Sequence, residues 1–230
     1  MASNNFPLSS TAMPTIPPRQ AVVHEDVILD GRLALFHRQE RWLAVADLHF
    51  GYELSQRAAG WLMPLWGMAS VEERLMELLI EYQPRHLLIL GDLVHDRTAA
   101  VQARGLIERL GAFCAPIVLA GNHDRQLAGR VTMHDSWESG RFFFHHGHCV
   151  AGVREQIQVI GHHHPAGSIT DGAGLRLKLP AFVQQGDCWI MPAFSPWAAG
   201  THWQPDAQSR IWLCTPQRVL RLPETAAGTT

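Results

Sequence analysis

The chain has 230 residues, of which 47% are hydrophobic and 17% are charged, and this composition excludes disordered and fibrous proteins. No segment approaches the ~20 consecutive apolar residues that cross a bilayer, so we expect no membrane interaction. The net charge of −2, with 14 histidines counted as neutral, excludes the strong positive field that binds nucleic acid non-specifically, although a local basic groove stays open as an alternative.

The two ends of the chain and its cysteines bear on its organisation. Residues 1–20 are rich in proline and serine and lack the basic and apolar regions of a signal peptide. We therefore predict a disordered N-terminal tail at 1–20, a single domain at 21–223 and a C-terminal tail at 224–230. The four cysteines are widely separated, without the paired spacing of zinc or redox sites, and are typical of reduced core thiols. Together these features predict a cytoplasmic protein.

The first half of the domain predicts strands that alternate with helices. The expected elements are a hairpin over 27–37, a buried strand over 42–49, a helix over 71–82, a strand over 86–90, a helix over 99–110 and a strand over 117–120. The first helix follows from apolar residues at helical spacing, and Pro84 ends it. Two successive β-α-β units indicate parallel strands beneath covering helices.

The second half, beyond Gly121, is dominated by short strand patterns. The predicted strands are 141–146, 158–163, 175–179, 188–191, 210–214 and 218–222. Glycine and proline between them indicate turns within one domain rather than a linker. We therefore predict an α/β protein, a four-layer α/β/β/α sandwich in which two mixed sheets pack face to face with helices outside.

Residues that bind metals or transfer protons cluster directly after these strands. They are Asp47, His49, Asp92, Asn122, His123, Asp124, His146, His162 and His164. The carboxyl ends of parallel strands meet at one edge of a sheet, so these side chains are expected to converge. Within the pairs 47/49 and 162/164, a spacing of two on extended backbone turns both members the same way. Oxygen and imidazole ligands without thiolate favour Mn, Fe, Zn or Ni, and two ions at ~3.5–4 Å form a clamp for phosphoryl chemistry.

Five segments resemble the successive motifs of the calcineurin-like metallophosphoesterases. They are DLH at 47–49, GDLVH at 91–95, GNHD at 121–124, HGH at 146–148 and GHHH at 161–164. Five motifs in the family's order, all at strand ends, make chance a poor explanation. The compact spacing, together with DLHFGYE at 47–53 and MPAFSPWAAG at 191–200, is similar to the small group that includes ligase- and helicase-associated DNA-repair phosphoesterases.

The resemblance implies two divalent metal ions, with Mn preferred and Fe, Zn or Ni as alternatives. One ion would be held by Asp47, His49, Asp92 and His164, and the other by Asp92, Asn122, His146 and His162. Asp92 would bridge them, and a water activated by both ions would attack phosphorus in line. His123 would act as general acid or as a cation at the transition state, oriented by Asp124.

Other residues near the motifs have weaker signals. His95 and Arg97 follow Asp92 closely and could contact substrate phosphate, although a solvated loop explains them equally well. His148 could touch phosphate or only support its loop. His145 and His163 alternate with ligands and are expected to point away from the site. Among the eight tryptophans, three in loop-like contexts are candidates for stacking on bases, namely Trp61, Trp66 and Trp197.

The function implied by the resemblance is a Mn-dependent phosphodiesterase. We expect a DNA endonuclease that acts on single-stranded DNA or nucleotide-like diesters in repair, with DNA ligase or helicase repair proteins as partners. A small-molecule phosphatase or pyrophosphatase would use the same binuclear site, because the motifs define hydrolysis but not the leaving group. A non-catalytic metal-binding interaction protein is disfavoured, since His123 and Asp124 are dispensable for metal binding yet present.

Overall fold

The computed structural model describes residues 18–149, 152, 154–206 and 208–223. The tail predicted at 224–230 lies outside these residues, and so do residues 1–17 of the tail predicted at 1–20. The first strand begins at Gln20, the last residue of that predicted tail. In the described part of the chain, no helix is both long and apolar enough to cross a membrane.

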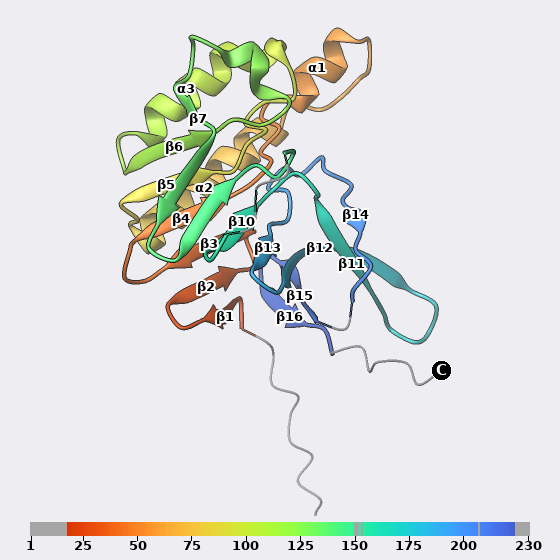
Figure 1. Ribbon diagram of the computed structural model, residues 1–230. Helices are drawn as coiled ribbons and strands as arrows, with labels where there is room; N and C mark the ends of the chain where they lie inside the picture. The colour runs from red at the N-terminus through yellow and green to blue at the C-terminus, as the bar shows by residue number, and fades with distance from the viewer. Residues whose placement is uncertain (1–17, 150–151, 153, 207, 224–230) are drawn as a thin grey trace, which may run out of the picture.

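The first sheet contains seven strands that follow one another in chain order (Figure 1). They are β1 (Gln20–His24), β2 (Val27–Asp30), β3 (Ala34–His37), β4 (Trp42–Val45), β5 (His86–Ile89), β6 (Ala115–Leu119) and β7 (Met133–His134). Strands β1 to β4 pair antiparallel, whereas β4 to β7 pair in parallel. The sheet is therefore mixed, and its parallel half presents the carboxyl ends of β4, β5 and β6 at one edge.

Helices connect the parallel strands. The helical segments are α1 (Tyr52–Ala58), α2 (Gly67–Tyr82), α3 (Ala100–Leu110) and the 3₁₀ turns η1 (Arg97–Ala99) and η2 (Asp124–Leu127). Right-handed crossovers that move in one direction along a sheet place their helices on the same face, so α2 and α3 cover one side of β4–β6. The helices predicted over 71–82 and 99–110 are confirmed, while α1 was not predicted.

The second sheet contains nine strands and is also mixed. They are β8 (Ser136–Ser139), β9 (Phe142–His145), β10 (Ile157–Ile160), β11 (Pro165–Thr170), β12 (Arg176–Gln185), β13 (Cys188–Ile190), β14 (Thr201–His202), β15 (Ser209–Thr215) and β16 (Arg218–Arg221). Strand β10 lies between β9 and β13 and is parallel to both. The long strand β12 pairs with β11 along its first half and with β13 and β15 along its second half.

The two sheets pack through an aromatic core. The fully buried ring of Trp42 in β4 meets Phe142 and Phe144 of β9 edge to face, with centroids 5.2 and 5.0 Å apart. Such pairs add to the stabilisation that comes from burying their area. The predicted sandwich of two mixed sheets is thus confirmed. In the described residues the α-helices all lie beside the first sheet, because the short connections of the second sheet contain turns and loops instead.

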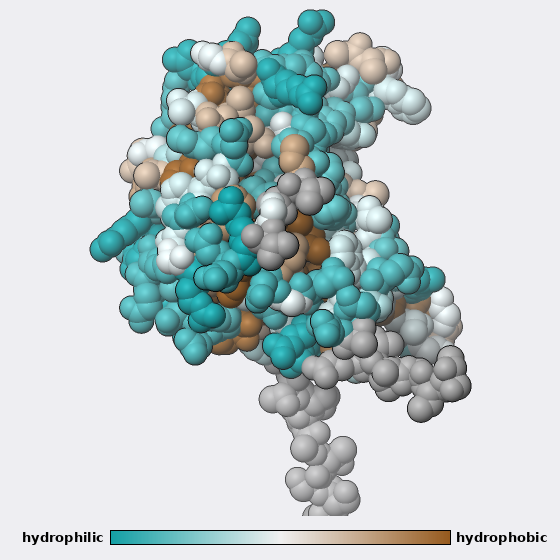
Figure 2. All heavy atoms as spheres, viewed as in Figure 1, coloured by the Kyte–Doolittle hydropathy of each residue, from teal (hydrophilic) through white to brown (hydrophobic). Residues whose placement is uncertain are grey.

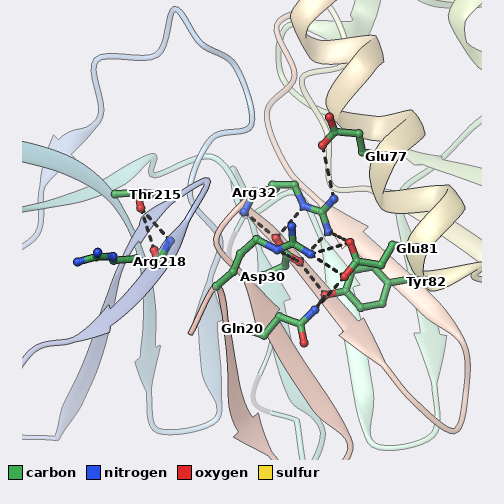
Figure 3. A network of polar contacts seen from close by, with 9 residues as sticks. Gln20, Asp30, Arg32, Glu77, Glu81, Tyr82, Thr215 and Arg218 are labelled. Carbon is green, nitrogen blue, oxygen red and sulfur yellow. Dashed lines mark hydrogen bonds and ion pairs between the residues drawn. The ribbon is translucent and has the colours of Figure 1, made fainter. Parts of the chain in front are cut away.

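A buried ionic network holds the end of α2 against the first sheet (Figure 3). Arg32, between β2 and β3, donates two hydrogen bonds to Asp30 and one to Glu81 of α2, at 2.6 to 3.0 Å. The Tyr82 hydroxyl donates another to Asp30 at 2.7 Å. Burial acts to raise the pKa of Asp30, but these partners together lower it. The outer face drawn in Figure 2 is mostly hydrophilic, as expected when apolar side chains fill the core.

Candidate metal centre

The loops after β4 and β5 run side by side and carry the first ligand candidates. The backbone N–H of Asp47 donates to the Gly91 carbonyl at 3.2 Å, and that of His49 donates to the Asp92 carbonyl at 2.9 Å. These bonds continue the pairing of the two strands past their ends. They place the side chains of Asp47, His49 and Asp92 at the same edge of the sheet.

Five of the predicted ligands have left-handed backbone. The φ angles are 53° at Asp47, 41° at His49, 47° at Asp92, 68° at His162 and 45° at His164. Residues with a side chain seldom adopt this conformation, and its cost of ~1–3 kcal/mol is characteristic of functional sites. The predicted convergence of the pairs 47/49 and 162/164 is observed, but its cause differs from the expected extended backbone. Each ligand is turned inwards by its own local conformation.

Two groups of donor atoms result. In the first, one donor atom each from Asp47, His49 and His164 lies within 4.8 Å of the others. His49 Nε2 is 3.4 Å from His164 Nε2, which is 3.6 Å from Asp47 Oδ1. The second group consists of Asp92, His146 and His162 under the same limit. The two groups reproduce the division of ligands that the resemblance implies.

Asp92 lies between the groups, and Asn122 adjoins the second one. Asp92 Oδ2 is 3.5 Å from His146 Nε2 and 4.0 Å from His49 Nε2, so one carboxylate oxygen reaches donors of both groups. The side-chain oxygen of Asn122 is 3.0 Å from His146 Nε2. All seven predicted ligands therefore meet at one place, and Asp92 has the position that a bridging ligand requires.

The hydrogen bonds of His146 test whether this site fits a cation. Its Nδ1 lies 2.9 Å from the Leu90 carbonyl, which can only accept, so Nδ1 carries a proton, and in the neutral ring Nε2 presents a lone pair. That lone pair faces two oxygen acceptors, from Asp92 and Asn122. A cation among these three atoms satisfies all of them, and a backbone carbonyl that accepts from the other ring nitrogen is typical of metal-binding histidines. The site thus fits a metal ion.

The protonation states of two donors, His49 and Asp92, agree with this fit. Burial lowers the pKa of His49 to about 3, although the Asp92 carboxylate acts against it. Burial acts to raise the pKa of Asp92, but His146 and the backbone N–H of His123 lower it to about 2. Near neutral pH the imidazole of His49 is neutral and the carboxylate of Asp92 is ionised. These are the forms that bind metal.

The ring of His146 packs directly against Gly91, in space that a side chain at this position would fill. The φ of Gly91 is +78°, and a Cβ at this position would lie 2.3 Å from His146 Nδ1. We predict that Gly91→Ala loses most of its bound metal, because His146 must move. Gly172→Ala is the matched control, since Gly172 has φ +76° in an exposed turn with no atom within 4 Å of such a Cβ. Metal analysis of both purified variants separates steric displacement from backbone strain, and equal metal loss would argue against the steric cause.

His123 and Asp124 follow Asn122 in the chain but have different partners. The Nδ1 of His123 is 3.0 Å from the carbonyl of His95, so that carbonyl orients the ring. The fully buried Asp124 carboxylate instead accepts the backbone N–H groups of Gly121 and Val94, at 3.0 and 3.2 Å. The predicted orienting role thus belongs to the His95 backbone, and Asp124 shapes the loops that carry His123 and Asp92.

A cavity of about 250 Å³ opens next to the first group. Its lining consists of His49, Tyr52, His95, His123, His164, Ser195, Trp197 and Ala198. The ring of His95 stacks on His123 with centroids 5.3 Å apart, so both rings belong to the same part of the cavity lining. Arg97 is exposed, and neither it nor His148 lines this cavity. His148 is exposed beside a second cavity of about 290 Å³, on the side of His146.

The remaining histidines and cysteines differ in exposure. His145 is partly buried and pairs with Gln158 at 3.2 Å, whereas His163 is exposed. Both belong to neither ligand group, as predicted. All four cysteines are free, but Cys149 is exposed rather than part of the core. Sequence reasoning missed Tyr52 and Ser195, although both lie in the segments DLHFGYE and MPAFSPWAAG that carry the narrower resemblance.

Comparison with known proteins agrees with the fold and the site. The model of the calcineurin-like phosphoesterase family matches residues 41–207, and the chain belongs to this family. The chain is similar to the crystal structure of nuclease MPE from Pseudomonas putida, with 27% identity, a TM-score of 0.69, and coverage of 85% of this chain and 94% of that one. YfcE, a phosphoesterase from E. coli, has 16% identity and a TM-score of 0.42, with 74% and 86% covered. No curated protein matches the sequence significantly.

Family and site together define a metal-dependent hydrolase of phosphoester bonds. Two groups of donor atoms could each hold a metal ion, and His123 lines the cavity beside the first of them.

Proposed function

We propose that the protein is a Mn-dependent phosphodiesterase, an endonuclease that cuts single-stranded DNA or similar flexible diesters in nucleic-acid repair. The observation that carries this proposal is the convergence of two donor groups around Asp92 beside a cavity that also contains His123. The nuclease MPE, similar over most of both chains, supports a nucleic-acid substrate. A cytoplasmic location and an association with repair ligases or helicases are part of the same proposal.

In this proposal, seven residues bind the metal ions and His123 transfers a proton. Asp47, His49, Asp92 and His164 would hold one ion, and Asp92, Asn122, His146 and His162 the other. When bound, the ions would lower the pKa of a water molecule and neutralise charge on the phosphoryl oxygens. His123 keeps its Nδ1 proton on the His95 carbonyl, which leaves Nε2 for the substrate. It can donate a proton or a hydrogen bond there to the leaving oxygen when the ring is protonated.

The proposed preference for single-stranded DNA follows from the burial of the candidate metal ligands. Asp47, Asp92 and His146 are at most 2% exposed, so a scissile phosphate has to enter the site to reach them. In-line attack also requires the phosphate to rotate into one orientation. A flexible single strand meets both conditions more easily than a duplex, whose bending costs several kcal/mol. With a net charge of −2, affinity for DNA is expected to be modest and salt-sensitive.

The alternative is a small-molecule phosphatase or pyrophosphatase. The modest size of the cavity, about 250 Å³, favours a small substrate. A non-catalytic metal protein is the third reading, and the placement of His123 in the cavity argues against it.

A single set of rate measurements distinguishes these three candidate functions. Initial rates would be measured on a small chromogenic diester, the matching monoester, a single-stranded DNA and the same DNA as a duplex, each with Mn, Zn, Ni, Mg or chelator. We expect the highest rates with Mn, diester faster than monoester, and single strand faster than duplex. A monoester rate well above every diester rate would establish the phosphatase instead, and no metal-dependent rate on any substrate would support the non-catalytic reading.

A further inference from the structure

Three aromatic side chains from separate segments meet beside the metal centre. Tyr52 begins α1, Trp66 precedes α2, and Trp197 follows β13 in the loop to β14. The rings of Trp66 and Trp197 lie 4.6 Å apart at 38°, and those of Tyr52 and Trp197 lie 6.3 Å apart at 30°. We call these three residues the aromatic platform. Trp66 packs at a tilt against Trp197, and Tyr52 lies farther from the same indole.

Trp197 is held in place by a buried carboxylate. Its indole N–H donates to Glu53 Oε2 at 3.1 Å, while Glu53 Oε1 accepts the backbone N–H of Met68 at 2.7 Å. Glu53 is only 1% exposed. A Cβ on Gly67 would lie 2.2 Å from the indole nitrogen, so glycine is needed for this close approach. The indole is therefore positioned before any ligand arrives, which lowers the entropic cost of stacking on it.

The platform is accessible, and two of its three residues line the cavity that also contains His123. Trp66 is 49% exposed, and Trp197 is partly exposed. Tyr52 and Trp197 line the cavity together with His49, His123 and His164. One part of the cavity lining thus consists of imidazole rings beside the first donor group, and another part consists of the Tyr52 and Trp197 rings. A ligand that uses both must combine a phosphoryl group with a planar ring, as a nucleotide does.

We propose that the aromatic platform is a stacking subsite for the nucleobase next to the scissile phosphate. This inference rests on the proposed phosphodiesterase function and names its substrate class as base-bearing. Because every base has a π face, such a subsite accepts any sequence, and it disfavours phosphoesters that lack a base. Loss of one base–aromatic stack typically weakens binding by roughly 5- to 150-fold.

The test compares two ligands that differ only in the base. Binding of deoxyadenosine 5′-monophosphate and of deoxyribose 5-phosphate to the Mn-loaded protein would be measured by calorimetry. We expect the nucleotide to bind at least about fivefold more tightly. Trp197→Leu should bring the ratio close to one, whereas Trp197→Phe should keep most of it. Both variants lose the N–H bond to Glu53, so the difference between their binding ratios measures the effect of the aromatic ring alone.

Trp61→Leu is the matched control, since Trp61 is 68% exposed in the same loop region and is not part of the cavity lining. Its ratio should equal that of the unmodified protein. Equal binding of the two ligands by the unmodified protein, or an equal loss of both ligands in Trp197→Leu, would overturn the stacking role. Hydrolysis of the small diester is measured in parallel, so failure of the phosphodiesterase proposal appears there and not in the binding ratio.

Discussion

Replacing Asp92 with alanine is expected to abolish phosphoester hydrolysis and to deplete both metal ions. One oxygen of this carboxylate lies 3.5 Å from His146 Nε2 and 4.0 Å from His49 Nε2, so it serves both donor groups. The other oxygen accepts the backbone N–H of His123 at 3.0 Å and so helps position that residue. Asp92 is thus the candidate for the bridging ligand. Its removal should therefore lower the affinity for each ion and displace the residue that acts on substrate.

The measurement is metal content by elemental analysis together with turnover of the small diester. Asp92→Asn is a second variant, which keeps an oxygen for the His123 N–H but lacks the bridging charge. We expect it to fold normally and still to lose metal. Asp187→Ala is the control, because Asp187 lies in an exposed turn at the far end of β13 from the ligands. Near-normal metal content and turnover in both Asp92 variants would show that Asp92 is not the bridge.

The fold could be predicted from the sequence where buried apolar residues recur at a regular spacing. In α2 the buried residues Val71, Leu75, Leu78 and Leu79 recur at helical spacing, so the helix can be recognised without a structure. The short helix α1 could not be found in this way. Its only buried residue is Glu53, a carboxylate, and the helix has no apolar stripe. Strands β7 and β14 have two residues each, too few for any period to appear.

The convergence of the ligand candidates was predictable for a related reason. Asp47 and Asp92 follow apolar strands, and the parallel topology that those strands imply brings their ends together. The contacts of His123 and Asp124 could not be predicted from the sequence in this way. His123 is oriented by a backbone carbonyl, which every residue has, and Asp124 accepts an N–H from Val94, 30 residues away. Contacts of this kind depend on how two loops meet in space, and residue type alone does not indicate them.

His123→Ala is expected to keep both metals and to lose most of the activity. His123 belongs to neither donor group, and its ring lines the cavity with Nδ1 held by the His95 carbonyl. The substitution therefore removes a group that acts on substrate and leaves the ligands intact. General acids contribute ~100- to 10,000-fold, and the rate should fall within that range on DNA.

The size of the loss should depend on the leaving group. An acidic phenol departs without protonation, so a nitrophenyl diester should show a much smaller loss than DNA, whose leaving alkoxide needs a proton. His163→Ala is the control, since the exposed His163 lies between two ligands yet belongs to neither group. It should retain metal and rate. If His123→Ala instead loses metal, His123 is a ligand. If its loss is equal on both substrates, the residue stabilises charge on a non-bridging oxygen, and proton transfer to the leaving group is excluded.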